Sequence, residues 1–119
     1  MANTFKVKTK ASVSHSSLAT VYTVPSSTTT VILGLILCNK TTNAITADVQ
    51  LVSDTSDTET NANVFLLKST TIPGGSSLEV LSGGKVNLQT TDVLKVQASV
   101  ASALDVSLSI MEILSLIHI

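Results

Sequence analysis

Strict alternation of apolar and polar residues recurs along this chain in short stretches, and clusters of turn-forming residues separate one stretch from the next. In the clearest stretch, residues 45–51, isoleucine, alanine, valine and leucine take every second position, and threonine, aspartate and glutamine take the others. A period of two residues is the pattern of a β-strand with one buried face. Many such strands with frequent turns are typical of a sandwich or jelly-roll and disfavour a fold of alternating helices and strands.

The composition favours the same fold class. Serine and threonine fill the polar positions, and valine, leucine, isoleucine and alanine fill the apolar ones, a mixture that suits a pleated, half-buried sheet better than a helix. With 119 residues, the chain has an ordinary size for a single domain, residues 1–119. We therefore expect an all-β fold, an antiparallel β-sandwich of jelly-roll or Ig-like type with about eight or nine short strands.

Two pairs of neighbouring stretches predict hairpins. Residues 94–100 and 106–110 both alternate, and the short segment between them is expected to join them as an antiparallel hairpin. A second hairpin is expected where residues 78–81 and 85–88 flank a serine and two glycines, because a loop of this composition reverses strands readily.

The N-terminal stretch carries lysines at alternate positions, Lys6, Lys8 and Lys10, with Phe5 among the residues between them. The alternation predicts a strand whose lysines form an exposed ridge, within an edge strand or arm formed by residues 1–13. Lysines on a sheet edge discourage unwanted pairing with another strand. The alternative role is contact with an acidic partner surface, which makes the three lysines candidate interface residues.

Residues 31–38 form an apolar run that would place apolar side chains on both faces of a strand. Such a strand is either central and covered on both sides, or it has one face against another subunit. Because the outer face of a sandwich sheet normally meets solvent, we favour a subunit contact, with Ile32 and Ile36 as candidate interface residues. Cys38 ends the run and is expected to be a small buried hydrophobe that forms no disulfide within the chain.

The chain ends in an almost wholly apolar tail, residues 114–119. An uncovered apolar tail would fray and associate with other surfaces. We predict that it docks on an adjacent subunit through the candidate interface residues Leu114, Leu116, Ile117 and Ile119. Only 13% of the residues are charged, and so neutral a surface also favours packing within a homo-oligomer or a larger assembly.

The charged residues and the start of the chain disfavour two classes of partner. The seven cations are all lysine, arginine and tryptophan are absent, and the net charge is −1, so no binding to nucleic acid is expected. The polar start lacks the apolar core of a signal peptide, and no apolar stretch approaches the ~20 residues that span a bilayer. No membrane association is therefore expected.

The sequence predicts no catalytic, cofactor-binding or metal-binding residues. His15 lies in a serine-rich turn and His118 lies next to the chain end, and no oriented nucleophile and base accompany either of them. Asp54, Asp57 and Glu59 lie in a polar loop whose spacing differs from that of the EF-hand calcium loop and which lacks its turn glycine. We therefore expect a solvated acidic loop and a protein that is not an enzyme.

Several segments carry a family resemblance. One contains Val-Tyr-Thr followed by proline, and another contains Ile-Pro-Gly, where Pro73 and Gly74 fit the middle of a tight turn. The segments are residues 19–25, 30–35, 39–46, 72–78 and 88–96. Together they resemble the small virion structural proteins of tailed bacteriophages, particularly of marine and cyanobacterial phages, in which these motifs recur in β-sandwich modules of head, neck, tail and fibre proteins.

The resemblance implies a multi-copy head decoration, neck or tail accessory protein, made in the host cytoplasm and carried in the virion. It implies other virion proteins as partners and no catalytic residues. The alternative is a receptor- or carbohydrate-binding module of a phage fibre. Sugar sites usually stack a ring on an aromatic side chain, and Phe5, Tyr22 and Phe65 are the aromatics of the chain, which makes the alternative weaker.

Overall fold

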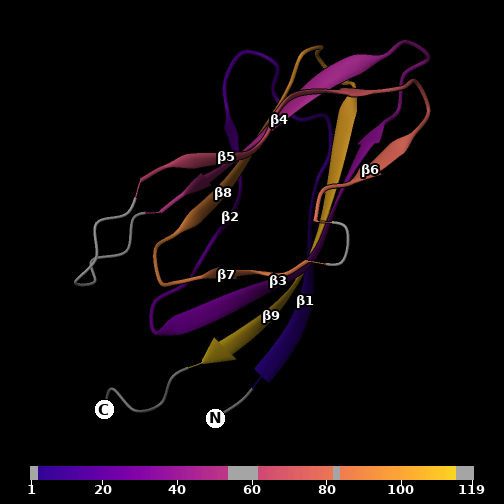
Figure 1. Cartoon of the computed structure of the whole chain (residues 1–119). Coiled ribbons are helices and arrows are strands. Elements are labelled where there is room, and N and C mark those ends of the chain that lie inside the picture. Colours follow the sequence, from indigo (N-terminus) through magenta and orange to yellow (C-terminus); the bar gives the residue numbers. More distant parts are fainter. Residues whose placement is uncertain (1–2, 54–61, 82–83, 115–119) are drawn as a thin grey trace.

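The computed structural model describes residues 3–53, 62–81 and 84–114, and all regular structure in these residues is β-strand (Figure 1). The strands are β1 (Asn3–Lys10), β2 (Ala19–Thr23), β3 (Thr28–Asn39), β4 (Ile45–Val52), β5 (Val64–Ile72), β6 (Ser77–Glu79), β7 (Val86–Leu88), β8 (Val93–Ala98) and β9 (Leu104–Leu114).

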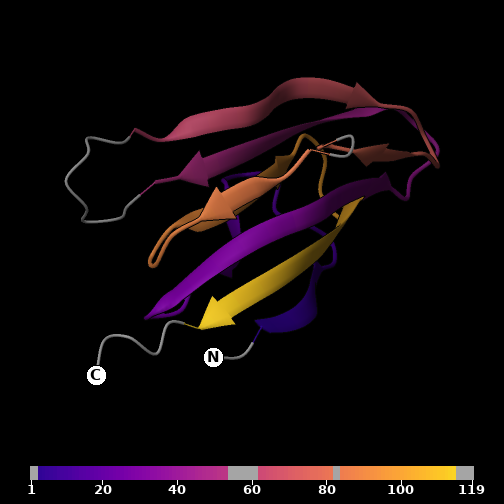
Figure 2. The same ribbon diagram turned by 60° about the horizontal axis from the view of Figure 1, so that its bottom comes forward.

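The strands form two antiparallel sheets. Sheet A has the order β1-β9-β3-β6, with β7 also paired to β3, and sheet B has the order β2-β8-β4-β5. Figure 2 shows β4 and β5 in one layer and β3, β9 and β1 in the other. The predicted all-β, antiparallel sandwich is thus confirmed.

The core lies between the sheets and is built from the alternate apolar positions of the long strands. In β8, for example, Leu94, Val96 and Ala98 are buried, and the residues between them are half-buried. Burial of such side chains stabilises the fold by roughly 1.5–3 kcal/mol each. The largest fully buried side chains include Ile32, Leu35, Leu37, Ile72, Leu88, Leu94, Leu104, Leu108 and Ile110.

A β-bulge in β3 changes which of its residues face the core. The pairing of β3 with β9 shifts between Ile32 and Gly34, which leaves Leu33 as an extra residue. Before the bulge Ile32 points into the core, and after it Leu37 does. Because the extra residue shifts the alternation by one, Ile36 turns outward and is 42% exposed, whereas Ile32 is fully buried.

The prediction of a hairpin between residues 94–100 and 106–110 is wrong. β8 pairs with β2 and β4, whereas β9 pairs with β1 and β3, so the two strands belong to different sheets. The connection crosses between the sheets: the Ser99 amide donates to the carbonyl of Thr46 in sheet B, and the carbonyl of Ala103 accepts from the Lys40 amide next to β3, both at 2.9 Å. The alternation identifies a strand, but it does not determine which other strand pairs with it.

The second predicted hairpin, between residues 78–81 and 85–88, is also wrong. β6 and β7 do not pair with each other, because both pair antiparallel with β3, one after the other along the same edge. They therefore run in the same direction and act as one interrupted edge strand. β3 has twelve residues, so it is long enough for both short strands to pair with it along the same edge.

The turn between β5 and β6 lies one residue further along than predicted. Pro73 occupies its first position, and its carbonyl accepts a hydrogen bond from the Ser76 amide at 3.2 Å. The two central residues are Gly74 and Gly75, and Gly75 has a φ of +70°. A turn whose third residue has a positive φ favours glycine there, because glycine adopts this conformation without steric strain, which explains Gly75.

Candidate interaction surface

Strand β1 presents its apolar side chains to solvent and its lysines toward the inner side of sheet A. Phe5 is 71% exposed and Val7 is 62% exposed, whereas Lys8 and Lys10 are half-buried. The prediction of an exposed lysine ridge is therefore wrong for Lys8 and Lys10. Of the three lysines of β1, Lys6 alone is exposed. The apolar residues between the lysines form the exposed face instead.

The inward position of Lys6 has a specific cause in the neighbouring strand. Its ammonium group lies 2.7 Å from Oε1 of Glu112, a residue on the inner face of β9 whose side chain is only 11% exposed. The phenol of Tyr22 donates a hydrogen bond to Oε2 of the same carboxylate. The Tyr22 oxygen lies 2.8 Å from Oγ1 of Thr30 and, since its proton goes to Glu112, it accepts from Thr30. We call these four residues the Glu112 cluster.

The Glu112 cluster sets two pKa values. The hydrogen bond from Lys6, and then the one from Tyr22, hold the pKa of Glu112 below its ordinary value despite burial. Burial, followed by the hydrogen bond to Glu112, raises the pKa of Tyr22 to about 12. Glu112 is therefore ionised and Tyr22 neutral at pH 7, and β1 is tied to β9 by a charge-assisted contact on its inner side.

Tyr22 allows a direct test of this cluster, because the chain has one tyrosine and no tryptophan. Ultraviolet absorbance of tyrosinate should rise with a midpoint near pH 12 in the native protein, and at about pH 10 in urea. A raised pKa favours the neutral phenol, so this stabilisation is complete below the unfolded pKa and is lost as the pH rises toward the folded one. A native midpoint near that of the urea sample would show that Tyr22 is exposed and would contradict the cluster.

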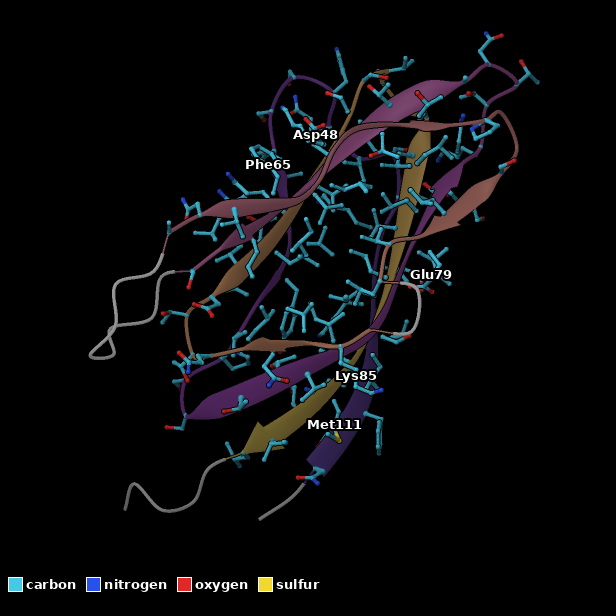
Figure 3. The ribbon with its side chains drawn as sticks, in the orientation of Figure 1. Asp48, Phe65, Glu79, Lys85 and Met111 are labelled. Carbon is cyan, nitrogen blue, oxygen red and sulfur yellow. The ribbon has the colours of Figure 1, made fainter. Side chains whose placement is uncertain are left out.

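The outward residues of β1, β9 and β3 form a continuous surface, which we call the outer face of sheet A. Its rows follow the strand register, so that Phe5 pairs with Met111 and Met111 with Val31, and Val7 pairs with Ser109 and Ser109 with Gly34. Met111 lies where β9 and β1 run side by side (Figure 3). The members of the outer face are Phe5, Val7, Thr9, Thr29, Val31, Leu33, Gly34, Ile36, Ser107, Ser109, Met111 and Ile113.

The outer face of sheet A also carries a carboxylate. Glu79 on β6 pairs in register with Ile36, and a Cβ atom on Gly34 would lie 3.7 Å from Oε1 of Glu79. The Glu79 carboxylate is held there by the Leu35 amide, which donates to it at 3.1 Å. Asp105, which pairs in register with Cys38 at the end of the face, forms an ion pair with Lys40 at 2.9 Å. In a monomeric β-sandwich, lysines normally point toward solvent and apolar residues toward the core. In β1 this order is reversed, which is typical of a face that another protein covers.

Sheet B carries a small polar hollow of about 130 Å³ on its surface. The carboxylate of Asp48 at this site is already occupied, since it accepts from the Ser69 amide at 2.6 Å and from Lys68 at 3.2 Å. Gln97 donates to the backbone carbonyl of His15 at 3.1 Å. The hollow is lined by His15, Thr46, Asp48, Ser69, Gln97, Ala98 and Ser99.

The aromatic side chains are distributed between the two surfaces and the core. Tyr22 is buried, with 6% of its area exposed, so it is unavailable to a sugar ring. Phe65 on β5 is 44% exposed, and Lys68 lies 4.6 Å from the centre of its ring. Figure 3 places Phe65 and Asp48 on the sheet B side of the molecule, away from Met111.

Within residues 3–53, 62–81 and 84–114, no group of three or more histidine, cysteine, aspartate or glutamate side chains could hold a metal ion. The same residues contain no helix long and apolar enough to cross a membrane. The predicted acidic loop with Asp54, Asp57 and Glu59 lies outside the described residues, as does His118.

The predicted interface residues fall into different places. Ile36 lies on the outer face of sheet A, and Leu114, at the end of β9, is 42% exposed. Ile32 belongs to the core, so the proposal that it contacts a partner is wrong. Cys38 is half-buried rather than buried. Three residues of the predicted tail, Leu116, Ile117 and Ile119, lie outside the described residues.

Sequence reasoning missed the most exposed apolar residues, Phe5 and Val7. Their alternation with lysines was visible, but polarity alone assigns the lysines to the solvent side. The direction of the lysines depends on the partner strand β9, which the sequence pattern does not identify. Lys6 pairs in register with Ile110 and reaches the buried Glu112 on the inner face. A glutamate within an otherwise apolar alternation, as at position 112, is the signal that an opposite charge is needed on the inner face.

No family model matches this chain, and no curated protein matches it. Among solved structures, the chain is similar to a protein from a structure of Bacillus endospore appendages, described as a novel family of disulfide-linked pili. The two share 14% sequence identity with a TM-score of 0.49, over 95% of this chain and 89% of that chain. The likeness is distant, and neither the fold described above nor the function proposed below rests on it.

Proposed function

We propose that this chain is a non-enzymatic structural component of a phage virion, present in many copies, that stabilises the particle through protein–protein contacts. The observation that carries the proposal is the reversed polarity of β1, which leaves the apolar side chains of Phe5 and Val7 exposed on the outer face of sheet A. An exposed apolar face promotes unwanted association of a monomeric protein, whereas in an assembly the same face is covered by a neighbouring protein.

The phage assignment is supported by the sequence motifs described above, the Val-Tyr-Thr segment with its proline and the Ile-Pro-Gly turn. In the structure these motifs have structural tasks: Tyr22 belongs to the Glu112 cluster, and Pro73 begins the turn between β5 and β6. Such tasks are consistent with a head decoration, neck or tail accessory protein whose partners are other virion proteins.

Quantitative mass spectrometry of purified phage particles tests this role. We expect the protein to be present in multiple copies per particle and to remain after washing at high salt, because an apolar contact is screened little by salt. Immunogold labelling of the same particles would give its position. Absence of the protein from particles that contain the major capsid protein would contradict the virion role.

A receptor- or carbohydrate-binding module is the second candidate, and the polar hollow on sheet B is the feature that favours it. The hollow has polar side chains but no phenylalanine, tyrosine or tryptophan in its lining, and sugar sites usually stack a ring on such a side chain. A sugar that binds there would shift the amide signals of Gln97 and Ser99, and an unchanged spectrum with a panel of sugars would remove this candidate.

A further inference from the structure

We propose that strand β1 is exchanged between two copies of this chain. In the exchanged dimer, β1 of each copy pairs with β9 of the other copy, and its Lys6 forms the ion pair with Glu112 of that copy. The second copy therefore supplies a residue without which the site of the buried carboxylate is incomplete. The inference deepens the proposed function by naming the partner and the mode of contact, and it rests on that function for its role in a particle.

Strand β1 is attached to the molecule without being part of its core. It lies at the edge of sheet A, beside β9 (Figure 2). None of its eight residues is buried, and among the described residues the core and the partly buried apolar side chains packed against it include none from β1. Its inner side consists of Thr4, Lys6, Lys8 and Lys10. β1 can therefore leave β9 without opening the core.

The hinge for this exchange is the short connection between Lys10, the last residue of β1, and Val13. Val13 is fully buried, and its amide donates to the carbonyl of Leu104 at 2.9 Å, so the chain is anchored at this residue. Ser12 has a φ of +53°, a left-handed conformation that residues with a side chain rarely adopt. A short connection under strain favours exchange, because the strain is released when the connection extends between two copies.

Three contacts hold the strained hinge closed, and all of them lie at the surface. The Ser12 amide donates to Oδ1 of Asp105 at 2.9 Å, and the ammonium group of Lys40 donates to Oγ of Ser12 at 2.9 Å. Lys40 also pairs with Asp105 at 2.9 Å. Because solvent competes for exposed contacts of this kind, they hold the closed hinge only weakly.

The edge of β9 selects β1 of this chain over an unrelated strand. The two strands pair without interruption over all eight residues of β1. The Glu112 side chain on the inner face of β9 is only 11% exposed, and it would remain as an unpaired buried charge if β1 left. A replacing strand must therefore run antiparallel to β9 and place a cation opposite Ile110, as Lys6 does. β1 of a second copy fulfils both conditions.

The exchanged dimer keeps the contacts between β1 and β9 and changes only the hinge. Each contact occurs twice, once for each copy, as in other dimers formed by exchange of an identical element. The balance between the closed chain and the exchanged dimer depends on the released hinge strain and on the concentration of the chain. We therefore expect a reversible dimer whose population rises with concentration.

Two substitutions of Ser12 should shift the dimer in opposite directions. Glycine adopts a positive φ readily, so Ser12→Gly removes the strain and should raise the dissociation constant of the dimer severalfold. Proline fixes φ at about −65° and has no N–H for Asp105, so Ser12→Pro disfavours the closed hinge and should lower the dissociation constant by about tenfold or more. Sedimentation velocity at several concentrations measures both values.

Opposite charge reversals test whether Lys6 and Glu112 come from different copies. Lys6→Glu and Glu112→Lys each place two like charges side by side in the closed chain. In an exchanged dimer with one copy of each variant, both sites again hold one lysine and one glutamate. The mixture should therefore form a heterodimer with a dissociation constant about tenfold or more below that of either variant alone. A mixture of Glu112→Lys with Lys85→Glu, which carries the same charge change at an exposed position, should show no such gain.

A cross-strand disulfide shows directly which chains contribute β1 and β9. Val7→Cys and Ser109→Cys, combined with Cys38→Ser, place two cysteines opposite each other in register, so that oxidation can join them. Dimers separated by gel filtration after oxidation should run as covalent dimers on a denaturing gel without reductant, because each bridge joins two chains. The monomer fraction of the same preparation is the matched control and should run as single chains.

Three results would overturn the inference: a Ser12→Pro variant that stays monomeric at every concentration, a charge-reversed mixture that associates no better than its control, or dimers whose bridges lie within single chains. If Glu112→Lys does not fold, the cysteine and hinge variants still decide, because they leave the buried carboxylate intact. These outcomes are separate from the virion role. A chain that forms the exchanged dimer but is absent from particles would retain the exchange and lose the proposed function, and a chain found in particles without exchange would do the reverse.

Discussion

Gly74→Ala is expected to destabilise the protein by about 3 kcal/mol. A Cβ atom at this position would lie 2.5 Å from the carbonyl carbon of Thr42 and 3.0 Å from the amide nitrogen of Asn43, and it would lie closer still to the Thr42 carbonyl oxygen. These are backbone atoms, so no side-chain rotation relieves the overlap. Urea unfolding followed by circular dichroism measures the change in the free energy of unfolding.

Gly75→Ala is the matched control for this prediction. Gly75 is the next residue and has the left-handed φ of +70°, but a Cβ atom there would meet nothing within 4 Å. Only the conformational cost applies, which is about 1 kcal/mol. If the two alanine variants lost the same stability, the close approach of the turn to the segment after β3 would be refuted.

Glu112→Gln is expected to destabilise the protein by about 2 kcal/mol at pH 7. Both carboxylate oxygens accept hydrogen bonds, one from Lys6 and one from Tyr22. An amide has a single acceptor oxygen, so one of these donors would face an NH₂ group in a largely buried site. The same urea titration measures the loss, and the Tyr22 absorbance midpoint should fall in parallel, because the nearby negative charge is gone.

The pH dependence of this difference gives an independent check. The pKa of Glu112 is lowered in the folded protein, so its contribution is complete above the unfolded pKa and is lost as the pH falls through the lowered folded value. The stabilities of the wild type and Glu112→Gln should therefore converge in acid. A difference that stayed constant down to strongly acidic pH would show that the glutamate acts through packing rather than charge.

Asp105→Asn provides a surface comparison. The Asp105 side chain is 43% exposed and pairs with Lys40, which is 38% exposed. Solvent screens such a pair, so we expect a loss below about 1 kcal/mol, smaller than that of Glu112→Gln.

The strands themselves could be predicted from the sequence because each long strand buries one face. The alternation over residues 45–51 corresponds to β4, and that over residues 106–110 lies within β9. The sandwich class followed from the number of such stretches and the turns between them. Periodicity is a local property, and it suffices for this level of description.

The pairing of the strands could not be predicted, because it depends on contacts between distant residues. β8 and β9 are adjacent in sequence and both alternate, yet they belong to different sheets. The β3 bulge is a second example. One extra residue at Leu33 reversed the faces expected for the rest of the strand, which separated Ile36 from Ile32.

The candidate surface could be predicted only in part. The apolar run that contains Ile36 correctly indicated a second apolar face on β3. The contribution of β1 was hidden, because its direction depends on the ion pair between Lys6 and Glu112, which are distant in sequence. Where a buried charge needs a partner, the usual rule that lysines face solvent fails.

Light scattering of the wild-type protein at several concentrations tests the central claim most directly, because the claim is that this chain is present in many copies and acts through protein–protein contacts on an exposed apolar surface. The account predicts a mass that rises from the chain mass of 12.4 kDa toward that of a dimer as concentration increases. A mass that stays at 12.4 kDa over the whole range would contradict it.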